Sequence, residues 1–285
     1  MAKPGDYLEL LKPRLISLLL FVAVVSMVVA EGYSLSFFKL VAMLILGFMS
    51  LGGAAALNNY IDRDVDVIME RTRDRAIPSG RIKPRAALAL GLGLVASSIV
   101  LSAIFLSLLT AFFMGLGAFA YAWFYTAFLK RRTPMGVVWG GVAGSIPALG
   151  GWAAVSNTGW FAPIMIFLIV YLWQPSHFWA LSMCVKDDYK NAGIPVLPAL
   201  KNENQVAKSM LISNIILIPF TYIMYLTGAL SPFYIYAITA LNIALLAYSV
   251  LAYLDHEKRV LWANYRYSLV YMFMILTSMV VARLV

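Results

Sequence analysis

Charged residues are scarce in this sequence. Only 12% of its 285 residues are charged, whereas 62% are hydrophobic, and the mean hydropathy is +0.83. A soluble domain of this length needs far more polar surface to stay dispersed. The composition therefore excludes a soluble protein and predicts that the lipid bilayer is its solvent. We expect no nucleic-acid partner.

Cysteine and histidine are also rare. The single cysteine, Cys184, excludes an internal disulfide, and two histidines, His177 and His256, are too few for a zinc site built mainly from imidazoles. No small-residue cleavage site follows the first apolar run, so we expect the first helix to be retained. A second, soluble domain is not indicated, and residues 1–285 are expected to form one transmembrane domain.

Long apolar runs are abundant. A helix needs about 20 apolar residues to cross a bilayer. Runs of roughly this length predict an all-α, polytopic protein of about nine transmembrane helices, at 15–30, 37–57, 86–107, 109–128, 136–155, 161–182, 208–227, 231–253 and 264–284. The division within 86–128 is the least distinct.

The placement of charge predicts an orientation. With nine helices and a cytoplasmic N-terminus, every Lys and Arg except Lys39 and Arg283 falls on the cytoplasmic side, as the positive-inside rule requires. Every acid except Glu31 falls there too, although the rule does not demand it. We therefore expect the chemistry on the cytoplasmic face and the C-terminus on the outer side.

One acidic cluster follows the second apolar run. Asn58, Asp62 and Asp66 are four residues apart, so on a helix they share one face. Two carboxylates at that spacing repel each other unless a cation lies between them, and Mg²⁺ prefers such oxygen ligands. The alternative is a solvated, charged helix end, but that alternative must explain polar groups directly after a long apolar helix. The spacing favours a Mg²⁺ site.

Basic residues surround this cluster in the sequence. Arg63, Arg71 and Arg75 lie within or just after it, and Lys130 and Arg131 follow the fourth apolar run. Arginine is the preferred bidentate partner of phosphate, although these residues could also serve only to set the topology. Beside a Mg²⁺ site they favour a substrate with a diphosphate head and a lipid tail.

A second polar cluster follows the sixth apolar run. Its members are Lys186, Asp187, Asp188, Tyr189, Lys190 and Asn191. Both clusters follow an even-numbered run, which predicts two acidic sites facing each other across a cavity. Adjacent residues point about 100° apart on a helix, so Asp187 and Asp188 need loop geometry to face one ion. His177 precedes this cluster and is open to three interpretations: a packing histidine, a proton carrier, or a contact to an iron or a ring substrate.

The sequence resembles the UbiA superfamily of intramembrane prenyltransferases, whose first motif NxxxDxxxD is met by Asn58, Asp62 and Asp66. Within that superfamily it is similar to the branch that farnesylates heme, over roughly residues 11–198. The matching stretches are LKPR from Leu11, NNYIDRDVDVIMERTRDRAIPSGRI from Asn58, LKRRTP from Leu129, GGVAGSIPALGGWAAV from Gly140, WQPSHFWAL from Trp173 and KDDYKNAGIPVLP from Lys186.

The resemblance implies helices around a central cavity, farnesyl diphosphate as donor, heme B as acceptor and heme O as product for terminal oxidases. It implies that Asn58, Asp62, Asp66, Asp187 and Asp188 serve Mg²⁺-diphosphate. It implies further that diphosphate or heme propionates bind Arg71, Arg75, Lys130 and Arg131, and that His177 lies near the heme. Whether a downstream heme A synthase or oxidase binds the chain is left open.

The sequence departs from the superfamily in its second motif. That motif is often DxxxD, but here Asp187 is followed at that spacing by Asn191. Two other functions are considered: a related prenyltransferase that forms quinones or lipids, and an ion-coupled transporter. A transporter predicts charges near the midplane of broken helices, whereas these charges cluster at one face.

Overall fold

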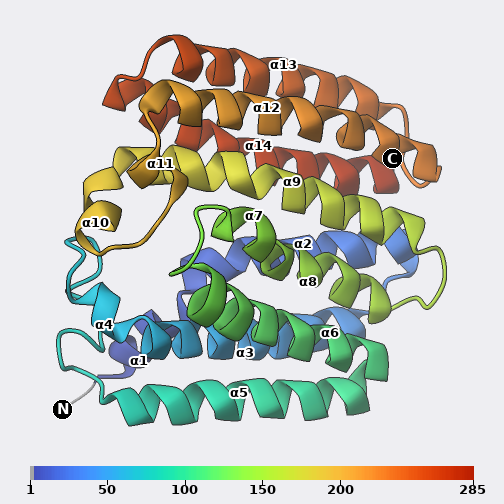
Figure 1. Cartoon of the computed structure of the whole chain (residues 1–285). Helices are drawn as coiled ribbons and strands as arrows, with labels where there is room; N and C mark the ends of the chain where they lie inside the picture. The colour runs from blue at the N-terminus through green and yellow to red at the C-terminus, as the bar shows by residue number, and fades with distance from the viewer. Residues whose placement is uncertain (1–2) are drawn as a thin grey trace.

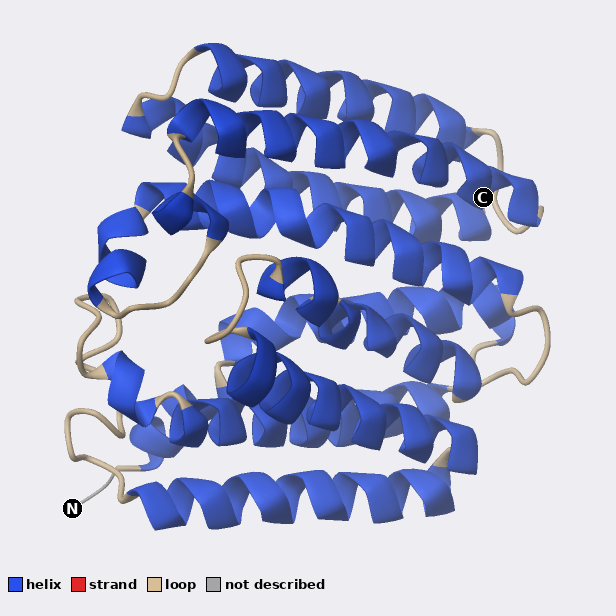
Figure 2. Cartoon of the chain, in the orientation of Figure 1, coloured by secondary structure: helices blue, strands red, loops and turns tan. Residues whose placement is uncertain are grey.

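The computed structural model describes residues 3–285, and every regular element in that range is a helix (Figures 1 and 2). Eight helices are long and apolar enough to cross a membrane. The prediction of an all-α, multi-pass membrane protein is confirmed. The long elements are α2 (Pro13–Glu31), α3 (Phe37–Ile61), α5 (Pro84–Phe105), α6 (Leu108–Phe119) with the π-helix Ala120–Leu129, α9 (Phe161–Cys184), α12 (Glu203–Ile223), α13 (Phe233–Leu254) and α14 (Lys258–Leu284).

The run predicted as a continuous helix at 136–155 forms two shorter helices, α7 (Gly136–Gly140) and α8 (Val142–Ala153). They meet at Gly141, whose N–H donates to the carbonyls of both Val137 and Val138. Pro147 inside α8 also has no N–H to donate. The break at Gly141 therefore divides a segment that is apolar enough to span, while α8 continues through Pro147. Helix α8 packs among α2, α6 and α9.

The indistinct division within 86–128 falls at Leu106 and Ser107. Ser107 is the N-cap of α6, and its Oγ accepts from the N–H of Thr110 at 3.0 Å. The same hydroxyl donates to the carbonyl of Ala153 at 2.9 Å. A single serine thus starts one helix and connects it to the end of another.

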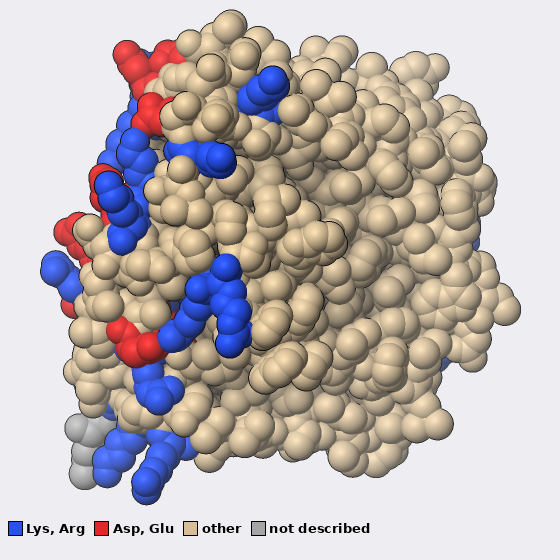
Figure 3. Space-filling model, in the orientation of Figure 1, with Lys and Arg blue, Asp and Glu red and all other residues tan. Residues whose placement is uncertain are grey.

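Four of the short helices lie toward one end of the molecule: α1 (Pro4–Leu11), α4 (Arg63–Asp66), α10 (Lys186–Asn191) and α11 (Leu197–Leu200). Figure 1 shows α1, α4 and α10 at the same end of the helix bundle, where most of the charged side chains in Figure 3 also gather. The long helices place the ends of α3 and α9, and the loops that follow them, at this charged end.

Helices α2 and α8 approach very closely at Gly151. A Cβ added there would lie 2.1 Å from the carbonyl oxygen of Ala23. No side-chain movement can relieve this clash, because the neighbouring atom belongs to the backbone. Small residues permit such backbone approaches between membrane helices. Nearby, Ser26 Oγ donates to the carbonyl of Ala148 at 2.6 Å and connects the same two helices.

We expect Gly151→Ala to destabilise the protein by about 1–3 kcal/mol, because the two helices must separate to admit the methyl group. The midpoint of thermal unfolding in detergent measures this effect. Gly150→Ala is the matched control, since its Cβ would meet Phe113 Cβ at an ordinary 3.5 Å. Equal midpoints for the two variants would contradict this account of the contact.

Candidate active site

The side chains of Asn58, Asp62 and Asp66 follow one another along one face of a helical segment. The N–H of Asp62 donates to the carbonyl of Asn58 at 2.9 Å, and the N–H of Asp66 donates to that of Asp62 at 2.8 Å. Asn58 Nδ2 also donates to Asp62 Oδ2 at 2.9 Å. The helical spacing therefore continues from α3 into α4. All three residues are buried, with no more than 4% of their surface exposed.

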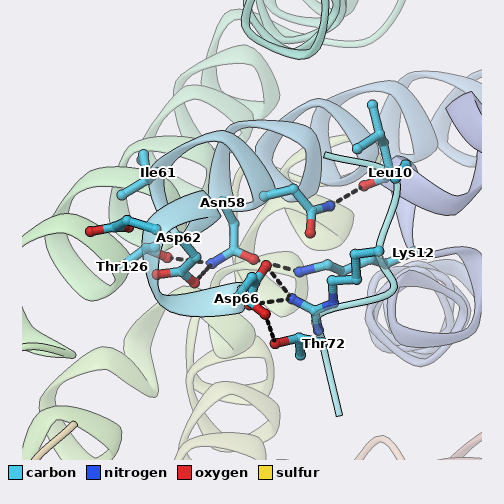
Figure 4. Close-up of polar contacts among 12 residues, drawn as sticks. Leu10, Lys12, Asn58, Ile61, Asp62, Asp66, Thr72 and Thr126 are labelled. Atoms are coloured by element: carbon cyan, nitrogen blue, oxygen red, sulfur yellow. Dashed lines mark hydrogen bonds and ion pairs between the residues drawn. The ribbon is translucent and has the colours of Figure 1, made fainter. Parts of the chain in front are cut away.

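Cations from three separate segments contact this stripe, and Figure 4 shows one of them, Lys12, beside Asn58 and Asp66. Lys130 Nζ, at the end of the π-helix, donates to Asp62 Oδ2 at 2.6 Å. Arg75 Nη1 donates to both oxygens of Asp66, at 2.9 and 3.1 Å. Lys12 Nζ, between α1 and α2, donates to Asn58 Oδ1. Lys130 and Arg75 balance the two carboxylates, and Lys12, when protonated, adds a further positive charge, which suits an anion such as diphosphate.

Lys12 is a member of this site that the sequence analysis missed. In the sequence, Lys12 is one of the basic residues that predict the orientation, and it belongs to the LKPR stretch of the resemblance, but nothing there predicts its contact with the stripe. Its backbone is left-handed, with φ 52° and ψ 56°, directly before Pro13. A non-glycine residue in this conformation is strained, and such strain is frequent at functional sites. Burial lowers the pKa of Lys12 to about 7, with a further contribution from Arg75 and opposition from Asp66 and Asp62.

The stripe offers a buried oxygen that could bind a metal ion. Asp62 Oδ1 is buried and accepts no hydrogen bond, and its ion-pair partner, Arg131 Nη2, is 3.7 Å away. Within residues 3–285, no group of three or more His, Cys, Asp or Glu side chains is placed to hold a metal ion. Mg²⁺ typically takes only one or two carboxylates and completes its shell with phosphate oxygens and water. The residues present therefore fit Mg²⁺ that arrives with a diphosphate.

Arg131 and Arg63 are directed elsewhere. Arg131 donates to both oxygens of Asp64, at 2.7 and 2.8 Å, and to the carbonyl of Ile61 at 2.9 Å. The Arg131 guanidinium holds the pKa of Asp64 at about 2. Arg63 donates to the carbonyl of Tyr60 and lies 4.4 Å from the centroid of that ring. The structure thus places Arg131 beside the stripe as a support, and it does not bring Arg63 to it.

The second polar cluster contacts the 67–75 loop, which follows the first acidic cluster. Asp188 accepts from the backbone N–H groups of Glu70 and Arg71, at 3.3 and 3.2 Å. Asp187 and Lys190 are exposed, and Lys186 pairs with Glu203 at the start of α12. The structure therefore brings the two clusters together through Asp188 and the 67–75 loop. Among residues 3–285, the carboxylates of the two clusters do not come close enough together to share one metal ion.

We expect Asp188→Ala to loosen the 67–75 loop, because two N–H groups lose their acceptor. The loop contains several arginines, so limited trypsin digestion should cut there at least severalfold faster than in the wild type. Asp187→Ala is the matched control, since Asp187 is exposed on the same short helix. Equal digestion of both variants would contradict the role of Asp188 as the anchor of this loop.

Arg71 carries a charge that no acid balances. Within residues 3–285 it forms no ion pair, and its side chain is exposed. Its neighbour Tyr189 is buried; burial raises the pKa of that phenol, while the nearby positive charge of Arg71 lowers it. Arg71 is thus available to a carboxylate or phosphate of a ligand.

His177 lies on α9 between two aromatic rings. Its ring centroid is 4.3 Å from that of Trp173 and 4.9 Å from that of Tyr265, and both rings are nearly parallel to the imidazole. Its Nδ1 is 2.7 Å from Ser268 Oγ on α14. The stacked rings therefore fix the plane of the imidazole, and the contact with Ser268 fixes the rotation of the ring within that plane.

Comparisons with known proteins agree with this geometry. Residues 19–276 match the model of the UbiA prenyltransferase family. Proteins named protoheme IX farnesyltransferase are similar over nearly the whole chain. One from Neorickettsia sennetsu is 39% identical, covering 94% of this chain and 89% of its own, and one from Symbiobacterium thermophilum is 37% identical, covering 96% and 92%. A third, from Chloroflexus aurantiacus, is 36% identical over 99% of this chain, which spans 48% of that relative's length.

Solved structures show the same fold. A structure from work on the biosynthesis of digeranylgeranylglyceryl phosphate synthase in membranes superposes with a TM-score of 0.81 at 17% identity, covering 98% of each chain. A UbiA homologue from Archaeoglobus fulgidus bound to DMAPP and Mg²⁺ superposes with a TM-score of 0.72 at 16% identity, covering 96% of this chain and 99% of its own. At such low identity, the likeness concerns the fold alone.

Proposed function

The chain belongs to the UbiA prenyltransferase family, and from this premise we propose that it transfers the farnesyl group of farnesyl diphosphate to a vinyl group of heme B, which gives heme O. The relatives named protoheme IX farnesyltransferase support this choice of substrates. The observation that carries the proposal is the buried stripe of Asn58, Asp62 and Asp66 with cations around it, at the end of a membrane-spanning helix.

The stripe receives the diphosphate of the donor. Each residue of the stripe accepts from one basic side chain: Asn58 from Lys12, Asp62 from Lys130 and Asp66 from Arg75. In the complex with the donor, these basic side chains would donate to the diphosphate oxygens. Asp62 and Asp66, with Asn58, would hold Mg²⁺. The ion, when bound, supplies positive charge against the leaving group.

The reaction breaks the bond between C1 of the farnesyl chain and the diphosphate oxygen, and the electron pair leaves with the diphosphate. The terminal carbon of the vinyl group forms a new bond to C1, and the cation that results on the vinyl group takes a hydroxide from water, releasing a proton. The basic side chains stabilise the negative charge that develops on the leaving group. The surrounding apolar helices exclude bulk water, which would otherwise quench the farnesyl cation.

The heme acceptor carries two propionates. Arg71, the exposed arginine that no acid balances within residues 3–285, is placed to pair with one of them. It is joined to the stripe by the short loop that also contains Arg75. Donor and acceptor are thus bound at the same end of the bundle, which we assign to the cytoplasmic face because it holds most of the basic residues.

The proposal is tested with membranes that contain the protein, labelled farnesyl diphosphate, Mg²⁺ and hemin under reducing conditions. We expect a labelled heme that is more hydrophobic than heme B and that is absent from membranes without the protein. Label in a quinone precursor or lipid, with none in heme, would assign the chain to another acceptor. Flux of an ion without a labelled product would support a transporter and overturn the proposal.

A further inference from the structure

An apolar cavity lies inside the bundle, between α2, α3, α6 and α8 (Figure 1). Its volume is about 430 Å³, which is in the range of small-molecule sites in proteins. The residues that line it are almost all apolar, and many of them are small, among them Ala23, Gly47, Gly117, Ala118, Ala143 and Gly150. The cavity therefore suits an apolar ligand.

The cavity lies along the face of α3 that bears the stripe. On α3 it is lined by Met43, Gly47 and Leu51. These residues precede Asn58 by 15, 11 and 7 positions, so all of them share one helix face with it. On the same face, the small residue Ala54 lies between Leu51 and Asn58. At 1.5 Å per residue, the cavity begins about 10 Å deeper in the bundle than Asn58.

Two hydrogen bonds between α3 and the helix formed by α6 and the π-helix follow the same course. Near the stripe, Asn58 Nδ2 donates to Thr126 Oγ1 at 2.9 Å. Beside the cavity, Ser50 Oγ donates to the carbonyl of Met114 at 3.2 Å. The stripe and the cavity therefore lie along one contact between the same two helices.

Two methionines close the deep end of the cavity. Met43 Sδ would be only 3.6 Å from a Cβ at Gly47, so its thioether lies over that glycine. Met114 is held in place, because its Sδ accepts from Ser102 Oγ at 2.8 Å and its carbonyl accepts from Ser50. Both methionines belong to one buried cluster. The cavity thus ends near the level of Gly47, about 16 Å deeper than Asn58.

This depth matches the length of a farnesyl chain. With C–C bonds of about 1.5 Å, an extended isoprene unit spans about 5 Å, so a farnesyl chain of three units spans about 15 Å and a geranylgeranyl chain of four units about 20 Å. A chain whose C1 is held at the level of Asn58 places its third unit in the cavity. A fourth unit would meet Met43 and Met114.

We propose that Met43 and Met114 set the upper limit on the donor's chain length at three isoprene units, because they close the cavity that receives the end of the chain. The inference rests on the proposed function, since it takes a prenyl diphosphate bound at the stripe as the donor. It adds the residues that select this donor by length.

The test is equilibrium binding of labelled geranyl, farnesyl and geranylgeranyl diphosphate to the purified protein with Mg²⁺, with transfer to hemin measured in parallel. We expect the wild type to bind farnesyl diphosphate at least about 10-fold more tightly than geranylgeranyl diphosphate. Replacing Met43 and Met114 together with alanine removes about as many non-hydrogen atoms as one isoprene unit contains. This double variant should bind geranylgeranyl diphosphate at least about 10-fold more tightly than the wild type does.

Ala118→Leu tests the cavity in the opposite direction, because Ala118 lines it and a larger side chain there fills it. We expect this variant to bind farnesyl diphosphate at least about 10-fold more weakly than the wild type. Its affinity for geranyl diphosphate should stay within about twofold, because two isoprene units span about 10 Å and end where the cavity begins.

Met279→Ala is the control for the loss of a buried methionine. Met279 is fully buried on α14, belongs to a different cluster and is not among the residues that line the cavity. This variant should keep the wild-type preference for farnesyl diphosphate even if it unfolds at a lower temperature.

The possible failures are distinguishable. A protein that binds none of the three diphosphates would overturn both the inference and the proposed function. The expected preference for chain length, with label transferred to a quinone precursor or lipid and none to heme, would support the inference and overturn the proposed acceptor. Labelled heme O formed by a protein whose preference is unchanged in the double variant and in Ala118→Leu would leave the proposed function intact and overturn the inference.

Discussion

Replacing Asp62 with asparagine is expected to lower the rate of farnesyl transfer at least about 1,000-fold, because the buried carboxylate both holds the metal ion and orients Lys130. The substitution keeps the size of the side chain and its contact with Asn58. The thermal unfolding midpoint should therefore change by no more than a few degrees. Turnover of labelled farnesyl diphosphate with hemin and saturating Mg²⁺ measures the effect.

Asp74→Asn provides the control for Asp62→Asn. Asp74 is an exposed acid in the loop at the same end of the molecule, and its side chain makes no hydrogen bond or ion pair within residues 3–285. We expect its activity to stay within about twofold of the wild type, as for most surface substitutions. Activity of Asp62→Asn within tenfold of this control would remove Asp62 from the catalytic site.

Replacing Lys12 with methionine is expected to lower kcat/KM for farnesyl diphosphate about 100-fold, because the site loses one of three cations that face the leaving diphosphate. Two control variants isolate the cause. Lys12→Gly also removes the charge but tolerates the left-handed backbone, so it should lose as much activity while unfolding at the same temperature as the wild type or higher. Lys83→Met removes an exposed lysine at the same end of the molecule and should have little effect.

The Lys12 variants separate charge from backbone shape. If Lys12→Gly retains the activity that Lys12→Met loses, the conformation at this position matters and its charge does not. If both retain activity, Lys12 supports the fold only. The account requires both to lose activity, with Lys83→Met unchanged.

Much of the site could be predicted from the sequence because its central residues are local. Asn58, Asp62 and Asp66 lie within three helical turns, so their spacing alone places them on one face wherever the helix continues. Eight of the nine predicted spans likewise follow from hydropathy over windows of about 20 residues. Hydropathy does not show where a glycine interrupts an apolar run, and the segment 136–155 therefore forms α7 and α8, which meet at Gly141, in place of one span.

The partners of the stripe could not be predicted, because they come from distant parts of the chain. Lys12 is 46 residues from Asn58, and Thr126, whose Oγ1 accepts from Asn58 Nδ2 at 2.9 Å, is 68 residues from it. The same holds for His177, whose partner Ser268 is 91 residues away. Their spacing carries no periodic signal. Lys12 also owes its position to a left-handed backbone conformation, which residue type alone does not favour.

The second acidic pair illustrates a different limit. Asp187 and Asp188 are adjacent, and the sequence does not specify which of them points inward. The structure directs Asp188 to the backbone of the loop after the first cluster and leaves Asp187 exposed. Metal binding by this pair stays a prediction, and the geometry supports the anchoring of the loop more directly.

The central claim is that the carboxylates of the stripe bind the donor's diphosphate through Mg²⁺. Equilibrium binding of labelled farnesyl diphosphate to the purified protein tests it without requiring turnover or heme. We expect binding that depends on Mg²⁺, that is abolished by EDTA, and that is lost when Asp62 and Asp66 are both replaced by asparagine in a protein that remains folded. Binding of equal strength without Mg²⁺, or undiminished in the double variant, would contradict the account.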